Sequence, residues 1–227
     1  VWDLMMKNIY SIDANQINKE DFKLNIFYSN PSPINYIEPV DSSKWPETLS
    51  KKTLLDYKKI FEIFNLLNRK IKSKKKIYVY GNGGSFADAS HFVSELTATY
   101  KNKNRIGLPF VLLSSNISSL TAWSNDLDYA SYLEREVQTH ISTGDILILI
   151  STSGGNYKSK QSINLLNAAK KAKKNKTYVV GILGNNGGDL KKYCNKSYVV
   201  KSKNTPSIQE NHKLIFHIIC ELFDLVY

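Results

Sequence analysis

The chain of 227 residues is long enough to form one domain with a core of its own. Apolar residues make up 42% and charged residues 22%, which excludes a wholly disordered chain, a collagen and a small disulfide-rich scaffold. No apolar run reaches the roughly 18 residues that a membrane-spanning helix needs, so we expect no membrane segment. Cys194 and Cys220 form no metal or redox motif, which fits a reducing, cytoplasmic compartment.

Lysine and arginine number 31 against 20 aspartates and glutamates, a net charge of +11. Such a charge attracts a phosphorylated metabolite or a nucleic acid, and it is also typical of a lysine-rich solvated surface. The densest basic run, at residues 70–76, precedes an apolar strand-like segment, where cations complement the end of a helix. We therefore expect no nucleic-acid partner.

The chain begins with a segment that has no sustained periodicity. Residues 1–47 hold Pro31, Pro33 and Pro39 among scattered aromatic side chains, so we expect an irregular arm that packs on another surface. From Thr48 to about Lys74, apolar residues recur at steps of three and four, which predicts a helix. The strands predicted beyond it are 77–80, 110–114, 145–150, 177–183 and 197–200. The helices predicted between and after them are 85–99, 118–123, 129–140, 158–174 and 207–226.

The predicted strands are apolar on both faces and are separated by helices. This pattern is typical of a parallel sheet that is covered by helices on both sides. We therefore predict an α/β fold over residues 48–227, with one doubly wound, flavodoxin-like parallel sheet of five strands.

A glycine-rich loop, Gly81-Asn82-Gly83-Gly84-Ser85, joins the first predicted strand to a helix. Glycines let the backbone turn sharply, and the free N–H groups of a helix N-terminus bind anions. The loop lacks the last glycine of the dinucleotide fingerprint, because Phe86 stands there, and it is not a Walker loop. An anion site and a plain strand–helix turn both remain open for it.

A second polar loop, Ser151-Thr152-Ser153-Gly154-Gly155-Asn156, follows the third predicted strand. Hydroxyls together with backbone N–H groups suit a phosphate or sugar hydroxyls. In parallel sheets, ligands bind beyond the carboxyl ends of the strands. Two such loops at equivalent ends indicate a binding site, whereas the loop of residues 184–188 after the fourth strand can be a simple turn.

Two helices carry side chains that could do chemistry. His91 and Glu95 are four residues apart on one helix, so they share a face and could bind a metal, share acid–base work or form a surface ion pair. On the last helix, Gln209 and His217 lie within roughly 80° of each other around the axis. Because His217 has apolar neighbours, the plainest interpretation of it alone is a core histidine.

The motifs occur in one order: Gly-Asn-Gly-Gly-Ser, a histidine three residues before Ser-Glu-Leu-Thr, Ser-Asn-Asp, Ser-Thr-Ser-Gly, and Ile-Gln-Glu-x-His-x4-His. Together, over about residues 48–227, they resemble the sugar isomerase (SIS) domain family, and within it the phosphoheptose isomerases. The resemblance implies a ketose–aldose isomerase that converts sedoheptulose 7-phosphate to D-glycero-D-manno-heptose 7-phosphate through an enediol. It also implies a role in a heptose pathway for a bacterial surface glycan, lipopolysaccharide or capsule.

The resemblance further implies which residues act. Glu95 aligns with the catalytic carboxylate of the family and His217 with its catalytic histidine. The implied substrate-binding residues are Asn82, Gly83, Gly84, Ser85, Glu95, Asn125, Asp126, Ser151, Thr152, Ser153, Asn156 and Gln209. A zinc site reported for some members implies His91, Glu95, Gln209 and His217 as ligands. A homotetramer with active sites shared between subunits is implied in the same way.

Three departures from the family pattern leave the exact sugar open. Phe86 replaces a residue that is often histidine, the second loop reads Ser-Gly-Gly-Asn for the usual Ser-Gly-Asn-Ser, and Pro206-Ser207 stand where Asp-Arg is common. The alternatives are an isomerase of another phosphosugar, such as arabinose 5-phosphate, and a non-catalytic SIS-fold regulatory protein, such as the partner of a replication initiator. Retention of His91, Glu95 and His217 together argues against the non-catalytic alternative.

Overall fold

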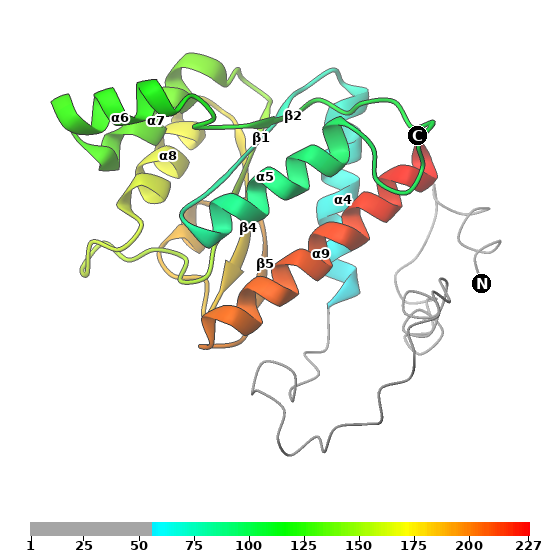
Figure 1. The fold of residues 1–227 in the computed structure, drawn as a ribbon. Coiled ribbons are helices and arrows are strands. Elements are labelled where there is room, and N and C mark those ends of the chain that lie inside the picture. Colours follow the sequence, from blue (N-terminus) through cyan, green and yellow to red (C-terminus); the bar gives the residue numbers. More distant parts are fainter. Residues whose placement is uncertain (1–55) are drawn as a thin grey trace, which may run out of the picture. The chain divides into compact units, whose positions relative to one another are not determined.

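The computed structural model describes residues 56–227 (Figure 1). The predicted arm of residues 1–47 and the first part of the predicted helix from Thr48 lie outside the described residues. The helices are α4 (Tyr57–Lys72), α5 (Gly84–Thr97), α6 (Ile117–Asp126), α7 (Tyr129–His140), α8 (Ile163–Lys174), the short 3-10 helix η2 (Leu190–Tyr193) and α9 (Thr205–Val226). The strands are β1 (Ile77–Gly81), β2 (Phe110–Leu112), β3 (Ile146–Ser151), β4 (Tyr178–Gly184) and β5 (Lys196–Val200).

All five strands form one parallel sheet in the order β2-β1-β3-β4-β5. This is the flavodoxin-like order, which agrees with the predicted doubly wound sheet of five strands. Gly81 at the end of β1 pairs with Ile150, and Ser151 at the end of β3 pairs with Leu183. The loops that follow β1, β3 and β4 therefore leave the sheet at the same edge, and the first two flank the point where the strand order reverses.

Helices cover both faces of the sheet. One face carries Tyr78, Leu147 and Val179, which belong to a core cluster with buried residues of α7 and α8. On the other face, α5 and α9 lie side by side (Figure 1), and Phe92 of α5 stacks on Phe216 of α9 with ring centroids 4.6 Å apart. Burial of both faces explains why the strand sequences are continuously apolar.

Several element boundaries differ from those predicted. The predicted helix 158–174 begins only at Ile163, because Asn156 and Gln161 exchange two backbone hydrogen bonds of 2.9 and 3.0 Å that close a tight hairpin before it. The helix predicted at 118–123 extends over Ile117–Asp126, and η2 was not predicted. In residues 56–227, no helix combines the length and the apolar character needed to cross a bilayer.

One histidine of α9, His212, has no hydrogen-bond partner among residues 56–227. His212 is fully buried, and neither ring nitrogen makes a hydrogen bond within residues 56–227, although the ring faces the backbone of Leu183. Burial lowers the pKa of His212 to about 4, because the charged imidazolium would lose its hydration. The folded protein therefore holds this ring neutral at pH values where the unfolded chain would protonate it.

This difference predicts a pH dependence of stability. As the pH falls from about 6.5 to about 4, the unfolded chain binds a proton at His212 before the folded protein does, so the free energy of unfolding falls by up to roughly 3 kcal/mol. Urea unfolding between pH 4 and 8 measures this. His212→Leu should flatten that part of the curve, whereas His140→Gln, at an exposed position, should not. An unchanged slope in His212→Leu would contradict the assignment.

Candidate active site

The loop after β1 leads directly into α5. Gly83 has a φ of +54°, a conformation that residues with a side chain rarely adopt, and its N–H and that of Gly84 lie at the start of the helix. A Cβ at Gly84 would collide with the amide of Gln209, in the first half of α9. The loop thus leads into a helix start of the type that can bind an anion, and it is the place where Gln209 meets α5.

Asn82 in this loop is held by residues that the sequence did not single out. Its amide and that of the buried Asn164 in α8 donate to each other at 2.9 and 2.8 Å. The hydroxyl of Tyr129, at the start of α7, also donates to Asn82 Oδ1 at 3.0 Å. The only sign of Asn164 in the sequence was an asparagine among the apolar residues of the predicted helix 158–174. Phe86, a departure from the family pattern, packs its ring against Tyr80 at 5.7 Å.

The loop after β3 is a compact turn lined with hydroxyls. The N–H of Gly154 donates to Ser151 Oγ at 3.0 Å, and that of Gly155 donates to Ser153 Oγ at 3.2 Å. Both hydroxyl oxygens accept from the backbone, and they lie 3.5 Å apart, so that one can donate to the other. At least one O–H group therefore remains as a donor for an anion. Asn156 is exposed, and its Oδ1 accepts from the N–H of Ser159, so it belongs to the hairpin rather than to the turn.

The loop after β4 supports the hydroxyl-lined turn. The N–H groups of Asp189 and Leu190 donate to the carbonyls of Gly155 and Gly154 at 3.0 and 2.9 Å. A Cβ at Gly154 would collide with the carbonyl oxygen of Gly187. The loop after β4, which the sequence allowed as a simple turn, therefore supports the loop after β3 through backbone hydrogen bonds.

The candidate acid–base residues gather where α5 faces α9. Nε2 of His91 lies 3.0 Å from Oε1 of Glu95, and the rings of His91 and His217 are 5.4 Å apart and nearly perpendicular. Tyr100 also stacks on His217, with centroids 5.7 Å apart. Burial lowers the pKa of His217, and the neighbouring His91 acts in the same direction. His217 is thus half-buried in a site and is not a core histidine.

A further charged pair lies along the same two helices. Asp88 is three residues before His91, so it shares the face that carries His91 and Glu95. Nζ of Lys213 lies 3.8 Å from Asp88 Oδ1, while the buried Oδ2 has no hydrogen-bond partner within residues 56–227. Burial raises the pKa of Asp88, and Lys213 partly opposes that shift. Sequence reasoning missed this pair, although its helical spacing was visible.

Comparison with known proteins places the chain in a family. The SIS domain matches residues 47–184. A phosphoheptose isomerase of a Nitratiruptor species is 41% identical over 186 residues, which cover 77% of this chain and 96% of that protein. One of Aliarcobacter butzleri is 44% identical over 154 residues, or 68% of this chain and 78% of that protein. The solved structure of a phosphoheptose isomerase from Francisella tularensis is 30% identical, with a TM-score of 0.68 over 74% of this chain and 85% of that one.

The chain belongs to the phosphoheptose isomerase branch of the SIS domain family. It is a phosphosugar isomerase. A second solved phosphoheptose isomerase, from Neisseria gonorrhoeae, has 31% identity and a TM-score of 0.66 over 74% of this chain and 85% of that one. The parallel five-stranded sheet that the sequence predicts is therefore confirmed both by the topology and by these likenesses.

The four predicted zinc ligands have the chemical types that a metal accepts, but their positions do not form a metal site. Two imidazoles, a carboxylate and an amide oxygen are nitrogen and oxygen donors of the types zinc accepts, although glutamine is an uncommon ligand. His91, Glu95 and His217 are neighbours, whereas the amide of Gln209 lies against Gly84. Within residues 56–227, no three His, Cys, Asp or Glu side chains are grouped closely enough to hold a metal ion.

Two predicted substrate-binding residues lie in the last turn of α6. Asn125 and Asp126 are exposed at the end of α6, where the amide of Asn125 donates to Asp126 Oδ1 at 2.9 Å. Within residues 56–227, neither forms a hydrogen bond to the loop after β1 or to the loop after β3. Their assignment therefore rests on the family resemblance.

The contact between the second and third loops predicts a large effect of one methyl group. Gly154→Ala should lower the free energy of unfolding by about 3 kcal/mol or more, since the methyl group meets the Gly187 carbonyl and φ is +73°. Gly83→Ala is the matched control, because φ is also positive there but the space is open, so the loss should be about 1–2 kcal/mol. Equal losses in urea unfolding would show that the loops do not depend on this contact.

Proposed function

We propose that the chain converts sedoheptulose 7-phosphate to D-glycero-D-manno-heptose 7-phosphate, with Glu95 and His217 as the acid–base pair. The observation that carries the proposal is the contact of His91 with Glu95 and His217 where α5 packs against α9. The loops after β1 and β3 add groups suited to a phosphate. The names of the relatives support the substrate. The partner of the protein is then a phosphorylated sugar.

The reaction moves a proton between C1 and C2 of the sugar through an enediol. In our assignment, the carboxylate of Glu95 removes the proton from C1 and returns it to C2, while His217 transfers a proton between the two oxygens. A lowered pKa keeps the imidazole of His217 neutral near pH 7, so that it can accept as well as donate a proton. The contact with His91 holds the Glu95 carboxylate in place at 3.0 Å.

The phosphate has two loops to bind it. We assign it to the hydroxyls of Ser151 and Ser153, together with the backbone N–H groups at the start of α5. The net charge of +11 adds a modest attraction for the dianion. Gly84 lies seven residues from His91, or about 10 Å along the helix at 1.5 Å per residue, so an extended sugar phosphate can reach from the loops toward the acid–base group.

We also propose a homotetramer with shared active sites. The side chains of His91 and Glu95 are 43% and 23% exposed, and an isomerase must keep water from its enediol. A second copy packed over this face would close the site. We place the enzyme in the cytoplasm, where Cys194 and Cys220 would stay reduced, and in a pathway that supplies heptose to a bacterial surface glycan.

Zinc binding at His91, Glu95, Gln209 and His217 is a further part of the proposal. Its support is the chemical type of the four donors, which would have to draw closer together than they lie in residues 56–227 to hold the ion. When bound, zinc would polarise a substrate oxygen. The protein groups that move protons are the same with or without it.

An isomerase assay on sedoheptulose 7-phosphate tests the reaction. Wild-type protein should turn over, and Glu95→Gln and His217→Gln should each lower kcat by about 100- to 10,000-fold, as expected for loss of a general acid or base. A chelator should lower the activity and zinc should restore it. His140→Gln is the control, since His140 is exposed at the end of α7.

Three results would count against these assignments. Full activity in either site variant would remove that residue from the mechanism. Full activity after complete metal removal would rule out a required zinc. An inactive wild type whose melting temperature still rises with the sugar phosphate would indicate another phosphosugar as the substrate.

The shared-site proposal predicts that activity depends on assembly. Light scattering coupled to gel filtration should give four times the mass of 25.8 kDa. On dilution, turnover per chain should fall over the concentration range in which the oligomer dissociates, because a separated chain leaves His91 and Glu95 open to water. A monomer with full turnover would contradict the proposal.

A further inference from the structure

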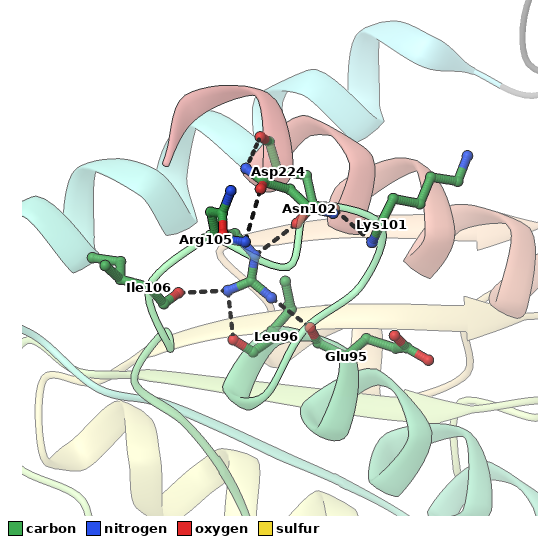
Figure 2. A network of polar contacts seen from close by, with 8 residues as sticks. Glu95, Leu96, Lys101, Asn102, Arg105, Ile106 and Asp224 are labelled. Carbon is green, nitrogen blue, oxygen red and sulfur yellow. Dashed lines mark hydrogen bonds and ion pairs between the residues drawn. The ribbon is translucent and has the colours of Figure 1, made fainter.

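A buried ion pair outside the two loops joins α5 to α9 (Figure 2). Arg105 lies between α5 and β2, and its side chain is wholly buried. Its Nε donates to Asp224 Oδ1 at 2.7 Å. Its other nitrogens donate to three carbonyls, those of Glu95 at 2.6 Å, Leu96 at 2.9 Å and Ile106 at 2.7 Å. The guanidinium therefore binds the last turn of α5, the segment that follows it and α9 at once.

Asp224 completes the network from the α9 side (Figure 2). Its Oδ2 accepts from the backbone N–H groups of Lys101 and Asn102, each at 2.8 Å. The amide of Asn102 also donates to the Asp224 carbonyl at 3.3 Å. Both carboxylate oxygens are thus used, and the side chain is 8% exposed.

The parts held by this network are those that carry the proposed acid–base pair. The carbonyl that Arg105 binds belongs to Glu95 itself, in the last turn of α5, where carbonyls lack helical partners. The segment held by Asp224 begins next to Tyr100, whose ring stacks on His217. Asp224 lies seven residues, or about two helical turns, beyond His217 on α9.

We propose that Arg105 and Asp224 are positioning residues, which set Glu95 relative to His217 for proton transfer. This inference rests on the proposed isomerisation and adds the groups that align its acid–base pair. The planar guanidinium serves four acceptors in fixed directions, which a lysine ammonium cannot reproduce. Small misplacements of catalytic groups are costly to turnover, so a loosened contact should reduce kcat more than substrate binding.

The test uses full-length protein, the sedoheptulose 7-phosphate assay and thermal unfolding of each variant. Arg105→Lys should lower kcat about 10- to 100-fold while KM changes less than about threefold. Lys196→Met is the control, because it removes an exposed ion pair between β5 and Glu62 of α4, outside the contact between α5 and α9. It should leave kcat and KM unchanged.

A second pair of variants covers the case in which Arg105→Lys does not fold. Tyr100→Leu breaks the contact between the held segment and His217 without touching the buried pair, so it should lower kcat with little change in KM. Tyr100→Phe keeps the stacked ring and should restore most of the turnover. A merely structural role would lower the melting temperature of these variants without this split between kcat and KM.

The outcomes separate this inference from the proposed function. An active wild type with unchanged kcat in folded Arg105→Lys, or in Tyr100→Leu where Arg105→Lys does not fold, overturns the positioning role alone. A loss that appears in KM rather than in kcat also overturns it. A wild type that is inactive on sedoheptulose 7-phosphate overturns the proposed function, and the positioning role falls with it.

Discussion

The packing of α5 against α9 is the interaction on which the candidate site depends. Phe92 and Phe216 stack in the apolar part of that contact. The imidazole of His217 then meets His91, while Gln209 lies against the first turn of α5. Glu95 lies on α5 and His217 lies on α9, so a shift of one helix along the other would separate the proposed acid–base pair.

The sheet supplies the second constraint. Because all five strands are parallel, the loops after β1, β3 and β4 must emerge at one edge. There the third loop supports the second through backbone hydrogen bonds, and α5 starts directly from the first. The loops proposed to bind phosphate and the α5–α9 contact are thus linked by α5 itself, because its first turn belongs to the loop after β1 and its last turns belong to the contact.

Sequence patterns were sufficient for the fold and for part of the site. Continuously apolar strands separated by helices predicted a parallel sheet, because such strands are buried on both faces. The spacing of His91 and Glu95 predicted their contact, because it is local to one helix. The spacing did not predict that His217, on a separate helix, lies beside His91 and Glu95. Only the family resemblance predicted this.

What the sequence could not give depends on tertiary packing. Asn164 and Tyr129 reach Asn82 from other helices, and no local pattern encodes such a meeting. The start of α8 was misplaced because a hairpin closed by Asn156 and Gln161 replaced the helical turns that the local composition favours. Arg105 was hidden for the same reason, since its partner Asp224 lies 119 residues away along the chain.

The most direct measurement is a crystal structure of the Glu95→Gln variant with sedoheptulose 7-phosphate bound. The account predicts the phosphate within hydrogen-bond distance of the Ser151 and Ser153 hydroxyls, with C1 and C2 of the sugar between residue 95 and His217. A phosphate bound elsewhere, with the reacting carbons away from both side chains, would contradict it.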